Sequence, residues 1–170
     1  MDKIKLNKTL VSKYKKIKLV LCDVDGVLTD GGMYYSKKGE ILKKFHTRDG
    51  MAIELLSKHG IKTGFITKEK SLITKSRAEK VNAFVFLGIK NKELELKKIC
   101  RKFKITTQQI AYIGDDINDT NIMKQVGFSA VPNDGMNNIK NISDYICKTK
   151  GGRGVLREVA DLIIQSSSKG

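Results

Sequence analysis

The sequence predicts an α/β protein built on a doubly wound parallel sheet. From residue 62 onward, apolar segments of strand length alternate with segments of helical periodicity. In two places, an apolar strand is followed at once by a glycine turn and clustered carboxylates. Strands that alternate with helices form right-handed βαβ units, whose strands run parallel. We therefore expect a single sheet with helices on both faces.

Each predicted element follows from its apolar spacing and from the turn residues that bound it. The hairpin turns at residues 36–39, which include a glycine, and Gly60 ends the first helix after the hairpin. In chain order, the predicted elements are a strand at 19–22, a β-hairpin formed by 33–35 and 41–45, a helix at 49–59, a strand at 62–67, a helix at 72–80, a strand at 83–87, a helix at 92–103, a strand at 110–114, a helix at 119–126, a strand at 128–131, a short strand at 144–147 and a helix at 155–165.

The N-terminal segment is a basic arm, which we place at residues 1–16, ahead of the main domain at 17–170. Leu6, Leu10 and Tyr14 recur at four-residue spacing among lysines, which is typical of an amphipathic arm packed on a domain. The same segment is equally compatible with a solvated terminus.

Length and composition fit one globular domain. The chain has 170 residues, of which 40% are hydrophobic, and this is enough for a sizeable core. No apolar run approaches the ~20 residues needed to cross a bilayer, and the N-terminus lacks the apolar stretch of a secretory signal. We therefore expect a cytoplasmic protein with no membrane partner. Cys22, Cys100 and Cys147 are too few and too scattered for a disulfide framework.

The charge balance is strongly basic. The formal net charge is +15, which attracts polyanions or small acidic substrates. The lysines are scattered over predicted helix faces, tryptophan is absent, and no platform of interleaved aromatic and basic residues is present. We therefore expect a small acidic substrate and no nucleic-acid partner, although composition alone leaves a polyanion-binding protein open.

Two acidic clusters follow strands. Asp23 and Asp25 end the first strand, and Asp115, Asp116 and Asp119 follow the strand at 110–114. In a parallel α/β sheet, ligands bind beyond the carboxyl ends of the strands, so the two clusters can face each other. Two like charges about 4 Å apart repel by roughly 4 kcal/mol at an effective dielectric near 20. The pattern therefore predicts a divalent metal ion held by oxygen ligands.

Thr67 and Lys92 add polar groups to the same edge of the predicted sheet. Thr67 ends one strand, and Lys92 begins a helix after the next. Hydrolysis of a phosphate monoester needs a nucleophile, a proton donor for the leaving oxygen and positive charge around the phosphoryl oxygens. An aspartate can be that nucleophile, through an aspartyl-phosphate intermediate. This set of residues therefore predicts phosphoryl transfer.

The order of these residues resembles the haloacid dehalogenase superfamily of phosphatases. Its four motifs fall on residues 23–27, Thr67, Lys92 and residues 114–119, and the resemblance covers the chain from about residue 17 to residue 164. The resemblance implies a Rossmann-like sheet of the haloacid dehalogenase type. It also implies that Asp23 attacks phosphorus, while Asp25 protonates the leaving alcohol and then activates water.

The same resemblance implies a Mg²⁺ site. The side chains of Asp23 and Asp115, together with the backbone carbonyl of Asp25, would hold the ion. Asp116 or Asp119 would orient the metal shell. By the same resemblance, the residues that bind the transferring phosphoryl group would be Thr67 and Lys92.

Within this superfamily, the chain is similar to the capless subfamily that dephosphorylates 3-deoxy-2-ulosonic acid sugars. Residues 23–32, the hairpin, residues 47–50 and residues 151–158 carry this similarity. Members act on 3-deoxy-D-manno-octulosonate 8-phosphate or on nine-carbon, sialic-type 9-phosphates. Between Asp25 and Thr67 the chain has room for a β-hairpin insertion and a helix, but not for a cap domain.

In capless relatives, a tetramer supplies the cover that a cap would give. The resemblance therefore implies a homotetramer associated through the hairpins. Met33, Tyr34 and Tyr35 suit such an interface, and a simple core contact is the alternative.

The residues implied to bind the sugar are Arg48, Glu69, Lys80 and Arg153. Glu69 and Lys80 stand where the nine-carbon branch carries a paired Glu and Lys, whereas Arg48 matches the eight-carbon branch. We favour a nine-carbon substrate on this basis. Lys68 replaces a usual glycine and is atypical of both branches.

Two further interpretations remain as alternatives. Cys147 and Arg153 have the Cys-x₅-Arg spacing of metal-free cysteine phosphatases, although Gly154 stands where these have a hydroxyl residue. A non-catalytic phospho-receiver module also gathers aspartates, a hydroxyl residue and a lysine around Mg²⁺. A receiver carries its phosphorylated Asp on a middle strand, and the strand at 62–67, which we take as the middle strand, has none.

Overall fold

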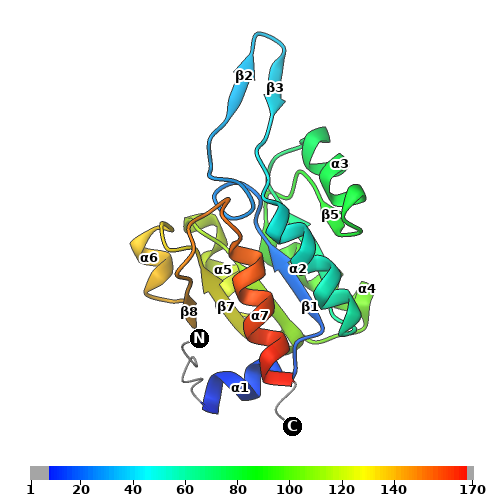
Figure 1. Cartoon of the computed structure of the whole chain (residues 1–170), viewed down its shortest axis with the longest axis vertical. Coiled ribbons are helices and arrows are strands. Elements are labelled where there is room, and N and C mark those ends of the chain that lie inside the picture. The colour runs from blue at the N-terminus through cyan, green and yellow to red at the C-terminus, as the bar shows by residue number, and fades with distance from the viewer. Residues whose placement is uncertain (1–7, 168–170) are drawn as a thin grey trace.

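The computed structural model describes residues 8–167, which form a parallel sheet between two layers of helices (Figure 1). The strands of the main sheet lie in the order β5–β4–β1–β6–β7–β8, and every neighbouring pair is parallel. Their bounds are β1 (Leu19–Cys22), β4 (Lys62–Ile66), β5 (Phe84–Phe86), β6 (Ile110–Ile113), β7 (Phe128–Val131) and β8 (Tyr145–Ile146). This is the doubly wound sheet that the sequence predicts.

The chain reverses its direction of travel across the sheet between β1 and β6. From β1 it builds β4 and β5 on one side, and it then crosses to build β6, β7 and β8 on the other. Such a switch point opens a crevice at the carboxyl ends of the two strands. The strand β4, which we took as the middle strand, in fact lies second from one edge, because β1 and β6 occupy the centre.

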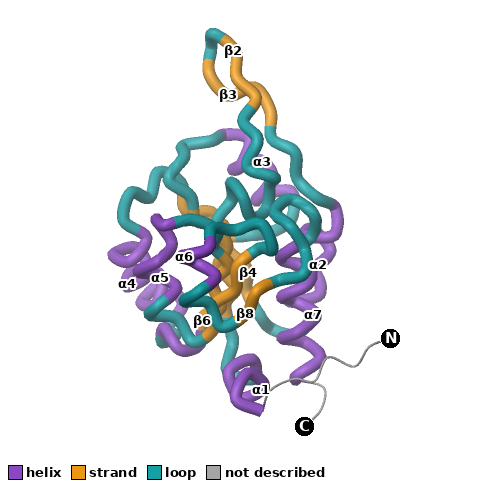
Figure 2. The backbone as a smooth tube through the Cα atoms, turned by 90° about the vertical axis from the view of Figure 1, so that its left-hand side faces the viewer, coloured by secondary structure: helices purple, strands orange, loops and turns teal. Residues whose placement is uncertain are grey.

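Helices cover both faces of the sheet (Figure 2). Successive β1 side chains point to opposite faces, so Val20 and Cys22 pack in one core and Leu19 and Leu21 in the other. The helices on the first face are α1 (Lys8–Tyr14), α2 (Thr47–Lys58), α3 (Leu72–Lys80) and α7 (Val155–Ser167). Those on the second face are α4 (Lys92–Phe103), α5 (Thr120–Met123) and α6 (Asn137–Lys140). Within residues 8–167, no helix has the length and apolar character that a bilayer crossing requires.

A β-hairpin projects from the body of the molecule beside α3 (Figure 1). It consists of β2 (Tyr34–Ser36) and β3 (Gly39–Leu42), which pair antiparallel. Between β1 and β4, residues 23–61 form this hairpin and α2 with no further domain, as the sequence predicts. The second strand ends at Leu42 rather than at residue 45, because Lys43 turns inward from the hairpin to the body.

Some short elements differ from the prediction. The helix expected at 119–126 is divided into the 3₁₀ turn η2 (Ile117–Asp119) and the short helix α5. It ends early because Gly127 N donates hydrogen bonds to the carbonyls of Thr107 and Ile110, which turns the chain into β7. Two short elements, α6 and the 3₁₀ turn η1 (Thr107–Gln109), were not predicted. Both are too short to show a hydrophobic period.

The helix α1 is packed against α7 and the sheet. Tyr14, at its end, is 1% exposed, and its ring meets that of Phe128 edge-on at 4.8 Å. Ile17 also lies in the core. Leu6, which we predicted on the same face of the arm, lies outside the described residues.

We predict that Tyr14 stabilises the domain through its ring and not through its hydroxyl. Within residues 8–167 the buried hydroxyl has no hydrogen-bond partner, so Tyr14→Phe should leave the free energy of unfolding unchanged or slightly higher. Tyr14→Ala should lower it by about 3–5 kcal/mol, because it leaves a cavity beneath α1. Urea denaturation measures both. An unchanged midpoint in Tyr14→Ala would mean that the arm is not part of the cooperative domain.

Candidate active site

The two acidic clusters lie together at the carboxyl ends of β1 and β6. Cys22 pairs in register with Ile113, and the amide of Asp23 donates to the Ile113 carbonyl at 2.9 Å. One carboxylate oxygen from each of Asp23, Asp115 and Asp119 lies within 4.8 Å of the others. The expected convergence of the two strand ends is therefore confirmed.

Gly26 allows this close approach. It has a φ of +85°, and a Cβ at this position would stand 2.0 Å from Asp115 Oδ2. Any side chain here would both strain the backbone and displace Asp115. The tight turn after β1 thus brings the backbone of residues 25–26 directly against the second cluster.

Lys92 is the cation at the centre of the acidic group. Its Nζ lies 2.9 Å from Asp23 Oδ1 and 2.7 Å from Asp119 Oδ1, and the side chain is buried. The side chain of Asn91 caps α4, and so fixes the place where this helix begins. Tyr112, on β6, donates its hydroxyl to Asp119 Oδ1 at 2.6 Å. We did not predict a role for Tyr112, since an apolar strand pattern gives no sign of this contact.

The carboxylates outnumber the lysine in this cluster. Burial, with repulsion from Asp23, Asp119 and Asp116, raises the pKa of Asp115 to about 8. Burial also raises the pKa of Asp23 to about 6, although Lys92 acts in the opposite direction. The fold therefore holds these oxygens together against their own repulsion.

These residues fit a divalent cation. The donors are carboxylate oxygens, which are the ligands that Mg²⁺ prefers. Asp119 already accepts hydrogen bonds on both oxygens, from Lys92 and Tyr112 on Oδ1 and from the amide of Asp115 on Oδ2. This leaves Asp23 and Asp115 as the direct candidates for ligands, and Asp119 as the residue that orients them.

Asp25 is bound by a second buried lysine. Lys43 Nζ lies 2.6 Å from Asp25 Oδ1, and the Lys43 side chain is only 1% exposed. Burial lowers the pKa of Lys43, but hydrogen bonds and charges from Asp25 and Glu40 outweigh this and raise it. We did not predict Lys43, because it stands beside Lys44 in a lysine-rich sequence and no pattern separates the two.

The cluster opens into a crevice of about 300 Å³. Thr67, at the end of β4, is buried in its wall, and its Oγ1 accepts a hydrogen bond from the Glu69 amide at 3.1 Å. The sequence-predicted residues Thr67 and Glu69 are thus brought to the acidic cluster. The lining residues are Asp23, Asp25, Thr67, Lys68, Glu69, Asp115, Asp116 and Asn118.

Asp116 lies at the exposed rim of this crevice. Its Oδ1 accepts a hydrogen bond from the amide of Ile117 at 2.6 Å and so caps η2. The Asp116 side chain stabilises the turn that carries Asp119, and it lies outside the group formed by Asp23, Asp115 and Asp119.

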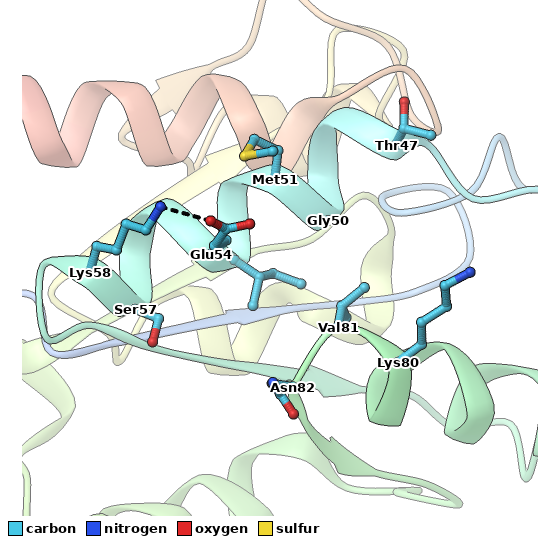
Figure 3. Close-up of a pocket in the computed structure, with 10 residues that line it drawn as sticks. Thr47, Gly50, Met51, Glu54, Ser57, Lys58, Lys80, Val81 and Asn82 are labelled. Carbon is cyan, nitrogen blue, oxygen red and sulfur yellow. Dashed lines mark hydrogen bonds and ion pairs between the residues drawn. The ribbon is translucent and has the colours of Figure 1, made fainter.

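Lys80 is not part of this crevice. It lies at the end of α3 and lines a separate cavity of about 560 Å³ between α3 and α2 (Figure 3). Glu54 and Lys58, which form an ion pair on α2, line another part of this cavity. Among the described residues, Glu69 and Lys80 form no ion pair with each other, so the pairing that the sequence suggested is not formed within one chain.

Arg48 and Arg153 are exposed and lie outside the crevice lining. The loop at 151–154 packs on the turn after β1, where the amide of Gly152 donates to the Val27 carbonyl at 3.0 Å. A Cβ at Gly154 would stand 3.5 Å from the Cβ of Arg48. The two arginines therefore belong to neighbouring segments beside the β1 turn.

The fold and this cluster define a class of protein. The chain matches the family of haloacid dehalogenase-like hydrolases over residues 59–159 and belongs to it. It is 37% identical over 158 residues to the 3-deoxy-D-manno-octulosonate 8-phosphate phosphatase KdsC of Haemophilus influenzae, covering 92% of this chain and 88% of that protein. It is 34% identical over 161 residues to KdsC of Escherichia coli K12, covering 94% and 86%. The chain is accordingly a phosphatase of this family.

Solved structures agree with this assignment. The 3-deoxy-D-manno-octulosonate 8-phosphate phosphatase of Yersinia pestis superimposes with a TM-score of 0.93 at 33% identity, over 96% of this chain and 89% of that one. The Moraxella catarrhalis enzyme, solved with magnesium, phosphate and a KDO molecule, gives 0.90 at 32% identity, over 95% and 94%. The cobalt-bound Haemophilus influenzae enzyme gives 0.90 at 37% identity, over 92% of each chain. The predicted fold is confirmed, and the Moraxella catarrhalis and Haemophilus influenzae enzymes were solved with a divalent metal.

We predict that the metal-free protein loses stability as pH rises. The pKa of Asp115 is about 8 in the folded state against 3.8 for a free Asp, so the folded state binds more protons between these values and stability falls with rising pH. Thermal unfolding in a chelator, compared at about pH 5.5 and about pH 8.5, measures this loss. Mg²⁺ should restore most stability at the higher pH.

The matched variants are Asp115→Asn and Asp161→Asn. The first should remove much of this pH dependence, whereas the second, at a partly exposed ion pair with Arg157 on α7, should retain it. The same pH dependence in both variants would contradict the assignment of the strain to Asp115.

Proposed function

We propose that this protein is a Mg²⁺-dependent phosphatase of 3-deoxy-2-ulosonic acid sugars, with 3-deoxy-D-manno-octulosonate 8-phosphate as its substrate. The observation that carries the proposal is the buried cluster of Asp23, Asp115, Asp119 and Lys92 at the switch point of the sheet. The names of the relatives support the eight-carbon substrate over the nine-carbon one that the sequence led us to favour.

In the proposed reaction, Asp23 attacks the phosphorus atom and the bond to the sugar oxygen breaks. Asp25 gives its proton to that oxygen, so the sugar leaves as an alcohol. Asp25 then takes a proton from a water molecule, which attacks the phosphorus of the aspartyl-phosphate. Inorganic phosphate leaves, and Asp23 is restored. The ion pair between Lys92 and Asp23 Oδ1, at 2.9 Å, orients the nucleophile for this attack.

Thr67 and Lys92 are proposed to bind the transferring phosphoryl group. Thr67 Oγ1 accepts the Glu69 amide hydrogen, which leaves the hydroxyl proton free to be donated to a phosphoryl oxygen. The ammonium group of Lys92 offers positive charge at the same end of the crevice. Together they supply the hydrogen bond and the charge that a dianionic phosphate requires.

Asp23, Asp115 and the backbone carbonyl of Asp25 would hold Mg²⁺. When bound, the ion neutralises negative charge on the phosphate and on the nucleophile. Asp119 is proposed to orient Asp115 through its backbone amide, and Asp116 to hold the turn between them.

The buried position of Cys147 supports the aspartate mechanism over a cysteine one. The residue is 1% exposed at the end of β8, and burial, with the charge of Glu158, raises the pKa of its thiol far above the ordinary range. A nucleophilic cysteine needs a lowered pKa and access to the substrate. Cys147 has neither.

The hairpin supports the proposed homotetramer. Its apolar side chains are unusually exposed, and burying them against other copies would remove this surface from water. Light scattering measures the mass of the assembly in solution and so tests this proposal directly. The exposed hairpin residues are Met33, Tyr34, Tyr35, Ile41 and Leu42.

We predict that Asp23→Asn lowers phosphate release from 3-deoxy-D-manno-octulosonate 8-phosphate by roughly 10³-fold or more. An amide cannot form the acyl phosphate, whereas Cys147→Ser should keep most of the activity. A chelator should abolish release by the unchanged protein, and added Mg²⁺ should restore it. The reverse ranking of the two variants would transfer the chemistry to the cysteine.

We predict that charge reversal at Glu69 changes sugar preference. Glu69 lines the crevice and matches the nine-carbon branch, so it is the observation that keeps a nine-carbon 9-phosphate as the second candidate. Glu69→Arg should shift the ratio of kcat/KM between eight- and nine-carbon esters by roughly 10-fold. Hydrolysis of p-nitrophenyl phosphate, which lacks the sugar, should change little. Equal losses on all three esters would exclude a specificity role.

A further inference from the structure

Lys43 is a buried lysine that the chemistry above does not use. It follows β3 at the stem of the hairpin, and its side chain is 1% exposed. Its Nζ contacts two carboxylates, Asp25 Oδ1 at 2.6 Å and Glu40 Oε1 at 2.7 Å. Lysine is almost never fully buried unless it is paired, so both contacts are needed to keep it there.

Glu40 is itself held by a third residue. Its other oxygen, Oε2, accepts a hydrogen bond from the Ser71 hydroxyl. Ser71 also caps α3, because its Oγ accepts the amide of Thr74 at 3.1 Å. A continuous path of contacts thus runs from Asp25 through the hairpin stem to the start of α3, which lies beside the base of the hairpin (Figure 1).

This path constrains one oxygen of Asp25 and leaves the other open. The contacts that Lys43 and Thr29 make with the Asp25 carboxylate both end on Oδ1. Among the described residues, none forms a hydrogen bond or ion pair with Oδ2. A carboxylate that is gripped on one oxygen presents the other in a fixed direction, which is what proton transfer to a leaving oxygen requires.

We propose that Lys43, anchored by Glu40, is a positioning residue that orients Asp25 for proton transfer to the leaving group. The inference rests on the proposed function, because it takes Asp25 as the proton donor. Stability alone does not explain this group of charges, since a buried ion pair often contributes no more than well-packed apolar residues of similar volume. The stem of the projecting hairpin therefore contributes to the active site from outside the acidic motifs.

The test compares two phosphate esters that differ in their need for a proton. The alkyl oxygen of 3-deoxy-D-manno-octulosonate 8-phosphate must be protonated as it leaves, whereas the p-nitrophenolate of p-nitrophenyl phosphate leaves without a proton. We expect Lys43→Met to lower kcat/KM for the sugar ester by roughly 10-fold or more, and for the aryl ester by less than about 3-fold. The parameter kcat/KM is used because it reports the first chemical step, in which the leaving group departs.

The chain offers a matched control in the next residue. Lys44 is half exposed and pairs with Asp30 at 2.6 Å, so Lys44→Met removes a neighbouring ion pair without touching Asp25. Both esters should be hydrolysed as by the unchanged protein. Glu40→Gln, which keeps Lys43 but loosens it, should give a smaller loss that is again confined to the sugar ester.

Equal losses on both esters in folded Lys43→Met, or no loss on either, would overturn the proposal. If Lys43→Met does not fold, it is replaced by the double variant of Lys43→Met with Glu40→Gln, which lacks the charges of both residues. The double variant is judged by its loss of kcat/KM for the sugar ester and by its loss for the aryl ester. Asp25→Asn distinguishes a failure of the proposed role of Asp25 from a failure of the proposed role of Lys43. If Asp25→Asn hydrolyses the sugar ester like the unchanged protein, the proposed role of Asp25 fails; if it shows the selective loss and Lys43→Met does not, only the inference about Lys43 fails.

Discussion

The ion pairs of Lys92 with Asp23 and Asp119 are the interaction on which the site depends. Like charges about 4 Å apart repel by roughly 4 kcal/mol at an effective dielectric near 20, and the three carboxylates are held within 4.8 Å of one another. A single buried ammonium group offsets only part of this repulsion. The rest is balanced by the packing of the sheet, so the folded protein keeps an excess of negative charge at this acidic cluster. The proposed binding of a divalent cation at this point follows from that imbalance.

The carboxylates are brought together by backbone segments that approach one another very closely at glycines. The turn after β1 approaches Asp115 so closely that only glycine fits at position 26. The loop at 151–154 then presses on the same turn from the other side, since a Cβ at Gly151 would stand 2.1 Å from the Gly26 carbonyl oxygen. This loop thus supports the turn that follows Asp23, the proposed nucleophile. This explains why the glycine-rich sequence before α7 belongs to the functional unit.

No cap domain lies between Asp25 and Thr67, and the hairpin found there has two features that bear on function. Its strands expose apolar side chains, while its stem sends Lys43 inward to Asp25. The exposed apolar surface and the lysine that binds the proposed proton donor therefore lie in one short element. In the proposed homotetramer, this element would join a subunit interface on its strands to the active site at its stem.

The sequence by itself determined the succession of strands and helices along the chain. It also determined the convergence of Asp23, Asp25, Thr67 and Asp115 at one edge of the sheet. These features depend on local periodicity and on the rule that parallel strands end at the same edge, and both can be read without coordinates. Only the tertiary structure decided which lysines are buried, because with 33 basic residues no local pattern distinguishes Lys43 from Lys44. It likewise separated Lys80 from Glu69 and brought Tyr112 to Asp119. Such contacts join different elements, and they depend on how whole elements pack rather than on the residues beside them.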